Sequence, residues 1–122
     1  MLETKNTMME TIESLNVMWK DMKKESKLTS EVIDIILDQI EDYDNPKDYF
    51  EDVLHYGCVS GVVPALITYE DTEKFFDKHV DEIFDLLNEV KEYGEITFEL
   101  NRNNLAWFAF EETLNRIYND LF

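Results

Sequence analysis

The sequence has few of the residues that define several common protein classes. It contains one cysteine, two prolines and three glycines among 122 residues. A single cysteine excludes an internal disulfide, which suits a reducing compartment. No apolar run approaches the roughly 20 residues that a membrane-spanning helix needs, and the first residues lack the basic and then apolar pattern of a secretory signal. We therefore expect a cytoplasmic protein with no membrane association.

Basic residues are scarce as well. The chain has 11 lysines and arginines against 28 aspartates and glutamates, which gives a formal net charge of −17. This charge repels DNA, RNA and anionic membranes, so it excludes direct binding to them by charge. It attracts basic proteins instead. The alternative is that the acidity only increases solubility.

The apolar residues are sufficient for one core. They make up 44% of the chain, and 122 residues fit a single domain. We predict a mainly α fold, a compact bundle of about five helices over residues 1–122. Its amphipathic N-terminal helix lies within residues 1–28, with the periodic part at 3–27. The other expected helices begin near Glu31 (capped by Thr29-Ser30), at Asn45-Pro46, near Glu73 and near Asn103. The helix near Glu73 is long and ends at Gly94.

The uncharged segment 53–69 is the most apolar part of the chain. Gly57 and Gly61 are four residues apart, so on a helix they would give one bare face for close packing. We expect a buried central helix here, followed by a bend at Pro64. Ile96, Phe98 and Leu100 alternate with polar residues, which indicates a short strand near 95–100 that can pair with 65–69.

The negative charge is concentrated in two segments, 31–52 and 70–99, each with a net charge of −8. In both segments the acids repeat at helical spacing, opposite an apolar stripe. We call them the first acidic row and the second acidic row. The first comprises Asp34, Asp38, Glu41 and Asp42, and the second comprises Glu73, Asp77, Asp81, Asp85 and Glu89.

Rows of like charge destabilise a helix slightly, which suggests that they serve a function. Carboxylates on adjacent turns lie about 5.4 Å apart along the axis, a spacing comparable to that of phosphates on a nucleic-acid strand. Two such helices on one face would fit a basic cleft built for DNA or RNA. The alternative is two solvated faces that point apart.

The N-terminal helix carries an apolar seam with coiled-coil spacing. Its residues are Met8, Ile12, Leu15, Trp19 and Met22. The seam either docks on the domain's own core or mediates self-association. The second possibility would make the protein a homodimeric structural or accessory component.

Two groups of residues suggest chemistry, and neither forms a known motif. Cys58 and His55 are close in sequence, but their apolar neighbours favour a buried, inert cysteine. Asp52, His55 and His79 could ligate a metal, but neither histidine belongs to the Glu-x-x-His pattern of helical di-metal sites. We therefore expect no cofactor, no metal and no enzymatic activity.

Residues 56–82 (YGCVSGVVPALITYEDTEKFFDKHVDE) and 105–113 (LAWFAFEET) resemble a family of uncharacterised proteins from tailed phages and prophages, a domain of unknown function. The resemblance implies phage origin and a place inside a bacterial host cell. Small acidic phage proteins of this class often inhibit host defence, as anti-CRISPR proteins do. Combined with the acidic rows, the resemblance implies an inhibitor that occupies a basic nucleic-acid-binding protein such as a CRISPR effector nuclease.

Overall fold

The computed structural model describes residues 2–61, 63–65 and 69–122, and these residues form six helices and one short hairpin. In chain order they are α1 (Leu2–Glu25), α2 (Lys27–Ile40), α3 (Pro46–Tyr56), β1 (Cys58–Val59), β2 (Val63–Pro64), α4 (Tyr69–Lys78), α5 (Val80–Lys91) and α6 (Arg102–Leu121). The mainly α prediction is therefore confirmed, with six helices where the sequence indicated about five.

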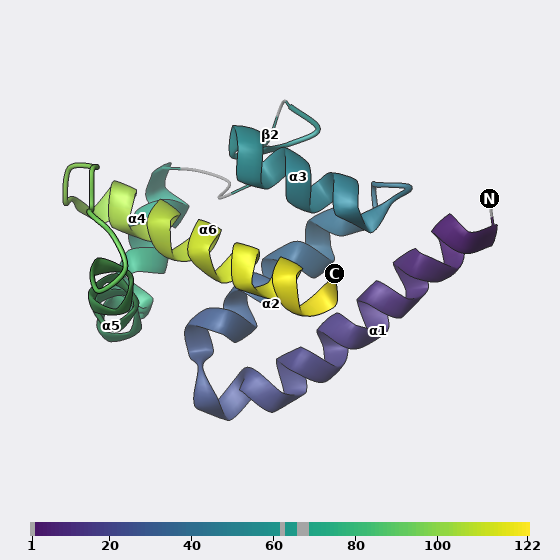
Figure 1. The fold of residues 1–122 in the computed structure, drawn as a ribbon, viewed down its shortest axis with the longest axis horizontal. Helices are drawn as coiled ribbons and strands as arrows, with labels where there is room; N and C mark the ends of the chain where they lie inside the picture. The colour runs from purple at the N-terminus through teal and green to yellow at the C-terminus, as the bar shows by residue number, and fades with distance from the viewer. Residues whose placement is uncertain (1, 62, 66–68) are drawn as a thin grey trace.

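The C-terminal helix α6 organises the core. It crosses the middle of the molecule and packs against α2, α3, α4 and α5 (Figure 1). Its inward residues include Phe110 and Leu114, which are fully buried. Helix α1 packs mainly on α2, and the two form a V in Figure 1. The apolar stripes predicted from the sequence thus meet around a single core.

The N-terminal cap of α2 lies at the apex of that V. It is three residues earlier in the chain than the cap predicted from the sequence. Ser26 has extended backbone angles, and its Oγ accepts a hydrogen bond from the Thr29 backbone N–H at 3.1 Å. The expected cap at Thr29-Ser30 is therefore wrong, because Ser26 already provides the side-chain acceptor that the first turn needs. Helix α3 begins as predicted, with Asn45 as its cap and Pro46 in its first turn.

The expected central helix across 53–69 is wrong. Helix α3 ends at Gly57, which adopts the left-handed conformation (φ 69°) that favours glycine. The chain then forms an antiparallel hairpin in which Cys58 pairs with Pro64 and Val59 with Val63. The Gly57–Gly61 spacing therefore marks a helix end and a turn rather than a bare helical face.

The expected strand at 95–100 is also wrong, since no residue of this segment is in a strand. Its proposed partner, 65–69, lies partly outside the described residues. The segment instead connects α5 to α6, and its half-buried Ile96 and Phe98 pack against the core. The apolar alternation there reflects this packing and not a β ladder.

The expected long acidic helix is two helices, α4 and α5, separated at His79. That residue has non-helical angles (φ −123°, ψ 23°) and is only 6% exposed. Its ring packs edge-on against the ring of Phe75, with 5.1 Å between the two ring centroids. The ring is buried, and the chain changes direction at this residue. Figure 1 shows α5 nearly end-on, whereas α2 lies across the view. No glycine or proline marks this break in the sequence.

The docking of α1 generates a stability prediction. Leu15 is fully buried, whereas Val17 on the same helix is 59% exposed. Leu15→Ala should lower the free energy of unfolding by about 2–5 kcal/mol, because it removes buried methyl groups and leaves a cavity. Val17→Ala, the matched control, should change it by less than about 0.5 kcal/mol. Urea denaturation followed by circular dichroism measures both, and equal small effects would contradict the docking of α1.

Candidate partner-binding surface

The first acidic row lies on the solvent side of α2 and the turn that follows it. Asp34, Asp38, Glu41 and Asp42 are all exposed. Within the described residues none of these four carboxylates has a hydrogen bond or an ion pair. From Asp34 to Asp42 the row extends about 12 Å along the chain, at 1.5 Å per residue. It is thus a line of negative charge that the protein itself does not neutralise.

The second acidic row is divided. On α4, Oδ1 of Asp77 lies 3.3 Å from Nη2 of Arg102. On α5, Oε2 of Glu89 lies 3.6 Å from Nη1 of Arg116. Asp81 and Asp85 are exposed and Glu73 is half-buried. In the described part of the chain these last three have no ion pair or hydrogen bond. The break at His79 and two internal pairs therefore leave a shorter row than the sequence indicated.

Glu31 joins α2 to the junction between α4 and α5. Its carboxylate accepts from His79 Nε2 at 2.9 Å and from Lys78 Nζ at 3.0 Å. The hydrogen bond from His79 is the main cause that lowers the pKa of Glu31. Burial opposes this shift, and Lys78 adds to it. Glu31 is therefore a structural carboxylate, and it holds the first acidic row beside the junction.

Glu82 makes a second link between the same elements. Its Oε2 accepts from the Leu28 backbone N–H at 2.8 Å and from the Ser26 hydroxyl at 3.3 Å. A carboxylate from α5 thus caps the N-terminus of α2, where the free N–H groups and the helix dipole favour negative charge. Together, Glu31 and Glu82 fix the start of α2 against the start of α5.

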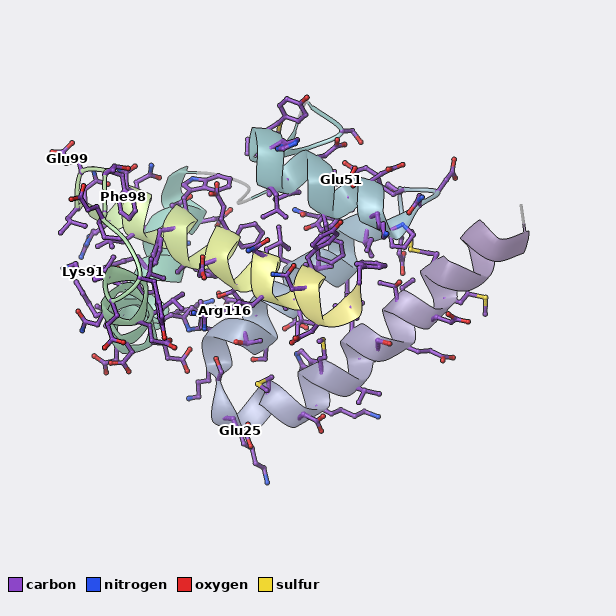
Figure 2. The ribbon with its side chains drawn as sticks, in the orientation of Figure 1. Glu25, Glu51, Lys91, Phe98, Glu99 and Arg116 are labelled. Carbon is purple, nitrogen blue, oxygen red and sulfur yellow. The ribbon has the colours of Figure 1, made fainter. Side chains whose placement is uncertain are left out.

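A groove of about 390 Å³ opens beside this junction, between the end of α1, the start of α2, and α5 and α6. We call it the acidic groove. Its floor is mostly apolar and comprises Met18, Met22, Leu28, Leu86 and Ile117, with the buried Thr113. Its rim carries Glu25, Glu82, Asp85, Glu89 and Asp120, together with Arg116. Figure 2 shows Glu25 where α1 ends and Arg116 on α6.

The sequence predicted only part of this groove. Asp85 and Glu89 were expected to bind a partner, whereas Glu25 and Asp120 lie outside both acidic rows. They are distant in the sequence, and the packing of α1, α2, α5 and α6 around the groove brings them to the same rim. The sequence did indicate one residue of the floor, because the apolar seam predicted on α1 includes Met22.

The seam residues of α1 face the protein's own core. Leu15 is fully buried, and Met8, Ile12 and Trp19 pack against the core. Met22 is half-buried in the acidic groove. Among the α1 residues whose side chains the structure describes, the exposed large apolar ones are instead Met9 and Val17, which do not belong to the seam. The seam is therefore largely occupied within the chain.

The residues considered for catalysis and metal binding have other roles or lie apart. Cys58 is half-buried rather than buried, and it shares a shallow hollow with His55 and Glu111. Burial raises the pKa of Glu111. Asp52 accepts a hydrogen bond from the Tyr43 hydroxyl at 2.9 Å. Among the described residues, no three His, Cys, Asp or Glu side chains are grouped so that they could hold a metal ion.

The Glu31 contacts predict a pH-dependent contribution to stability. A carboxylate whose pKa is lowered by folding stabilises the fold above its ordinary value of 4.5, and this contribution is lost as the pH falls through the lowered pKa. Glu31→Gln should therefore reduce the free energy of unfolding at pH 7 by about 1 kcal/mol. The difference from the wild type should shrink below pH 4.5.

The matched control is Asp34→Asn, one turn along α2, where the described residues provide no partner. It should have little effect at either pH. Urea denaturation at pH 7 and at pH 4 measures both variants. The structural role of Glu31 would be contradicted if Glu31→Gln left the free energy of unfolding unchanged at pH 7, or if it lowered this free energy more at pH 4 than at pH 7.

Comparisons with known proteins place the chain in a family. No helix among the described residues is long and apolar enough to cross a membrane. No curated protein and no solved structure matches the chain. A family model described as a domain of unknown function, DUF7222, matches residues 16–122, which include both segments of the phage-like resemblance. The chain therefore belongs to the DUF7222 family, and the matched domain begins within α1 and continues to the last residue.

Proposed function

We propose that this protein is a non-enzymatic inhibitor that binds the basic, nucleic-acid-binding surface of another protein. One observation carries the proposal: seven of the nine carboxylates in the two acidic rows have no partner in the described part of the chain. Arg102 and Arg116 pair only with Asp77 and Glu89 of the second row, so the other seven charges are available to lysines and arginines of a partner.

Electrostatics favours such a partner over other classes. A net charge of −17 repels nucleic acids and speeds the encounter with a basic protein. Lysines and arginines that normally contact phosphates can form charge-assisted hydrogen bonds with carboxylates instead. Binding should weaken as salt rises, because exposed charges are screened.

The geometry favours contact with a single line of basic residues. The first acidic row runs along α2 and the turn that follows it, whereas the second is divided at His79. Since α2 and α5 run in different directions (Figure 1), the rows do not lie parallel like the two strands of a duplex. We therefore propose that the first row makes the main contact and that Asp81 and Asp85 add to it.

The phage-like sequence segments suggest which partner to test. A phage protein of this kind would act inside the bacterial host, and the host protein with an extended nucleic-acid channel would be a defence nuclease. We propose a CRISPR effector nuclease as the partner class. The apolar seam of α1 does not favour the alternative of a self-assembling accessory protein, since most of it packs within the chain.

The test is inhibition of target-DNA cleavage by purified CRISPR effector–guide complexes. The wild-type protein should inhibit at least one effector, and inhibition should fall as salt rises. The triple variant Asp34→Lys, Asp38→Lys and Asp42→Lys should lose inhibition, because it replaces a line of anions with cations. All three residues are exposed, so the variant should remain folded by circular dichroism.

The matched control reverses three exposed acids of α1: Glu10→Lys, Glu13→Lys and Asp21→Lys. It makes the same change in net charge away from both rows, and it should retain most of the inhibition. Absence of inhibition across the effectors tested, or equal loss in both triple variants, would contradict the proposal.

A further inference from the structure

The acidic groove differs from the acidic rows because its floor is apolar. A row of carboxylates on a solvated helix can attract any cation, but an apolar floor adds a requirement for an apolar side chain. We infer that the acidic groove binds a basic amphipathic helix of a partner protein, with apolar side chains on the floor and lysines or arginines at the rim. This inference rests on the proposed function and specifies the partner's binding element.

The floor suits side chains of variable shape. Met18 and Met22 come from the end of α1, and Leu86 and Ile117 from the facing helices. Methionine is unbranched and polarisable, so it adapts to different apolar partners. The volume of about 390 Å³ is near the lower end for ligand sites, which leaves room for a few side chains and not for a whole helix. A helix would therefore lie across the mouth and insert one apolar edge.

Some of the carboxylates at the rim have a partner within the protein, and others do not. Glu82 caps α2, and Glu89 is paired with Arg116. Arg116 also contacts Glu112 at 3.3 Å, so it is already held by two carboxylates. The remaining rim acids, Glu25, Asp85 and Asp120, are exposed, and the described residues offer them no partner.

These three carboxylates come from α1, α5 and α6, so they surround the floor on different sides. A ligand must then present cations on both flanks of an apolar residue. A helix does this when lysine or arginine lies on either side of an apolar i, i+3/i+4 edge. Charge complementarity thus selects a basic amphipathic helix. A second copy of this chain, with its net charge of −17, would be repelled.

The test uses the full chain and two synthetic peptides labelled with fluorescein, each about 14 residues long, or four helical turns. One is an amphipathic Leu/Lys helix, and the other has the same lysines with every leucine replaced by serine. Fluorescence anisotropy measures both dissociation constants. The Leu/Lys peptide should bind roughly tenfold more tightly or better, because each buried leucine adds apolar contact.

Two matched double variants locate the site. Asp85→Asn with Asp120→Asn removes two rim charges and should weaken Leu/Lys binding about fivefold or more. Asp38→Asn with Asp42→Asn removes the same charge from the first acidic row and should change it less than about twofold. Met22→Gln makes the floor polar and should reduce the preference for the Leu/Lys peptide over the Ser/Lys peptide.

Equal affinity for the two peptides, or equal loss in the two double variants, would overturn the groove assignment. Neither outcome would contradict the proposed inhibition, which depends on the first acidic row and is measured with a nuclease. Dimerisation of the wild type that Met22→Gln abolishes, seen by analytical ultracentrifugation, would show that a second copy occupies the groove and would also overturn the inference. Conversely, the groove assignment can hold even if no CRISPR effector is inhibited.

Discussion

The arrangement of this protein depends on two carboxylates that join the start of α2 to the start of α5. Glu82 caps the N-terminus of α2, and Glu31 accepts hydrogen bonds from Lys78 and the buried His79. Among the described residues, these contacts are the polar links that hold the acidic helix α5 beside α2, whose exposed face carries the same charge. Both acids gain cationic or N–H partners, which offsets the cost of placing them at a partly buried junction.

The same contacts determine which charges remain available. Because Glu31 and Glu82 are used inside the fold, and Arg102 and Arg116 are paired with Asp77 and Glu89, the acids of the two rows and of the groove that remain without a partner among the described residues lie on α2 and the turn after it, at Glu73, at the start of α5 and at the groove rim. The grouping creates two kinds of surface, a solvated line of charge on α2 and a charged rim around an apolar floor.

Local patterns predicted the helices well and their ends less well. The apolar spacing of α1, α2 and α6 was sufficient to place them, because those stripes form the core, and Asn45-Pro46 marked the start of α3. The break at His79 has no local signal, and the hydrogen-bond partner of its buried ring, Glu31, is 48 residues earlier. The groove had no local signal either, because Glu25 and Asp120 come from α1 and α6 and line it together only in the folded protein. Gly57 was misinterpreted because glycine suits both close helix packing and a left-handed helix end.

The most direct test of the central claim is an NMR titration of the ¹⁵N-labelled protein with a lysine-rich, otherwise polar peptide. Such a peptide responds to rows of closely spaced carboxylates and not to apolar surface. The account predicts that backbone amide shifts concentrate at residues 34–42 and 81–85, and that they diminish with added salt. Shifts of equal size at the exposed acids of α3, such as Asp48 and Glu51, would contradict it, because the peptide would then be responding to net charge alone.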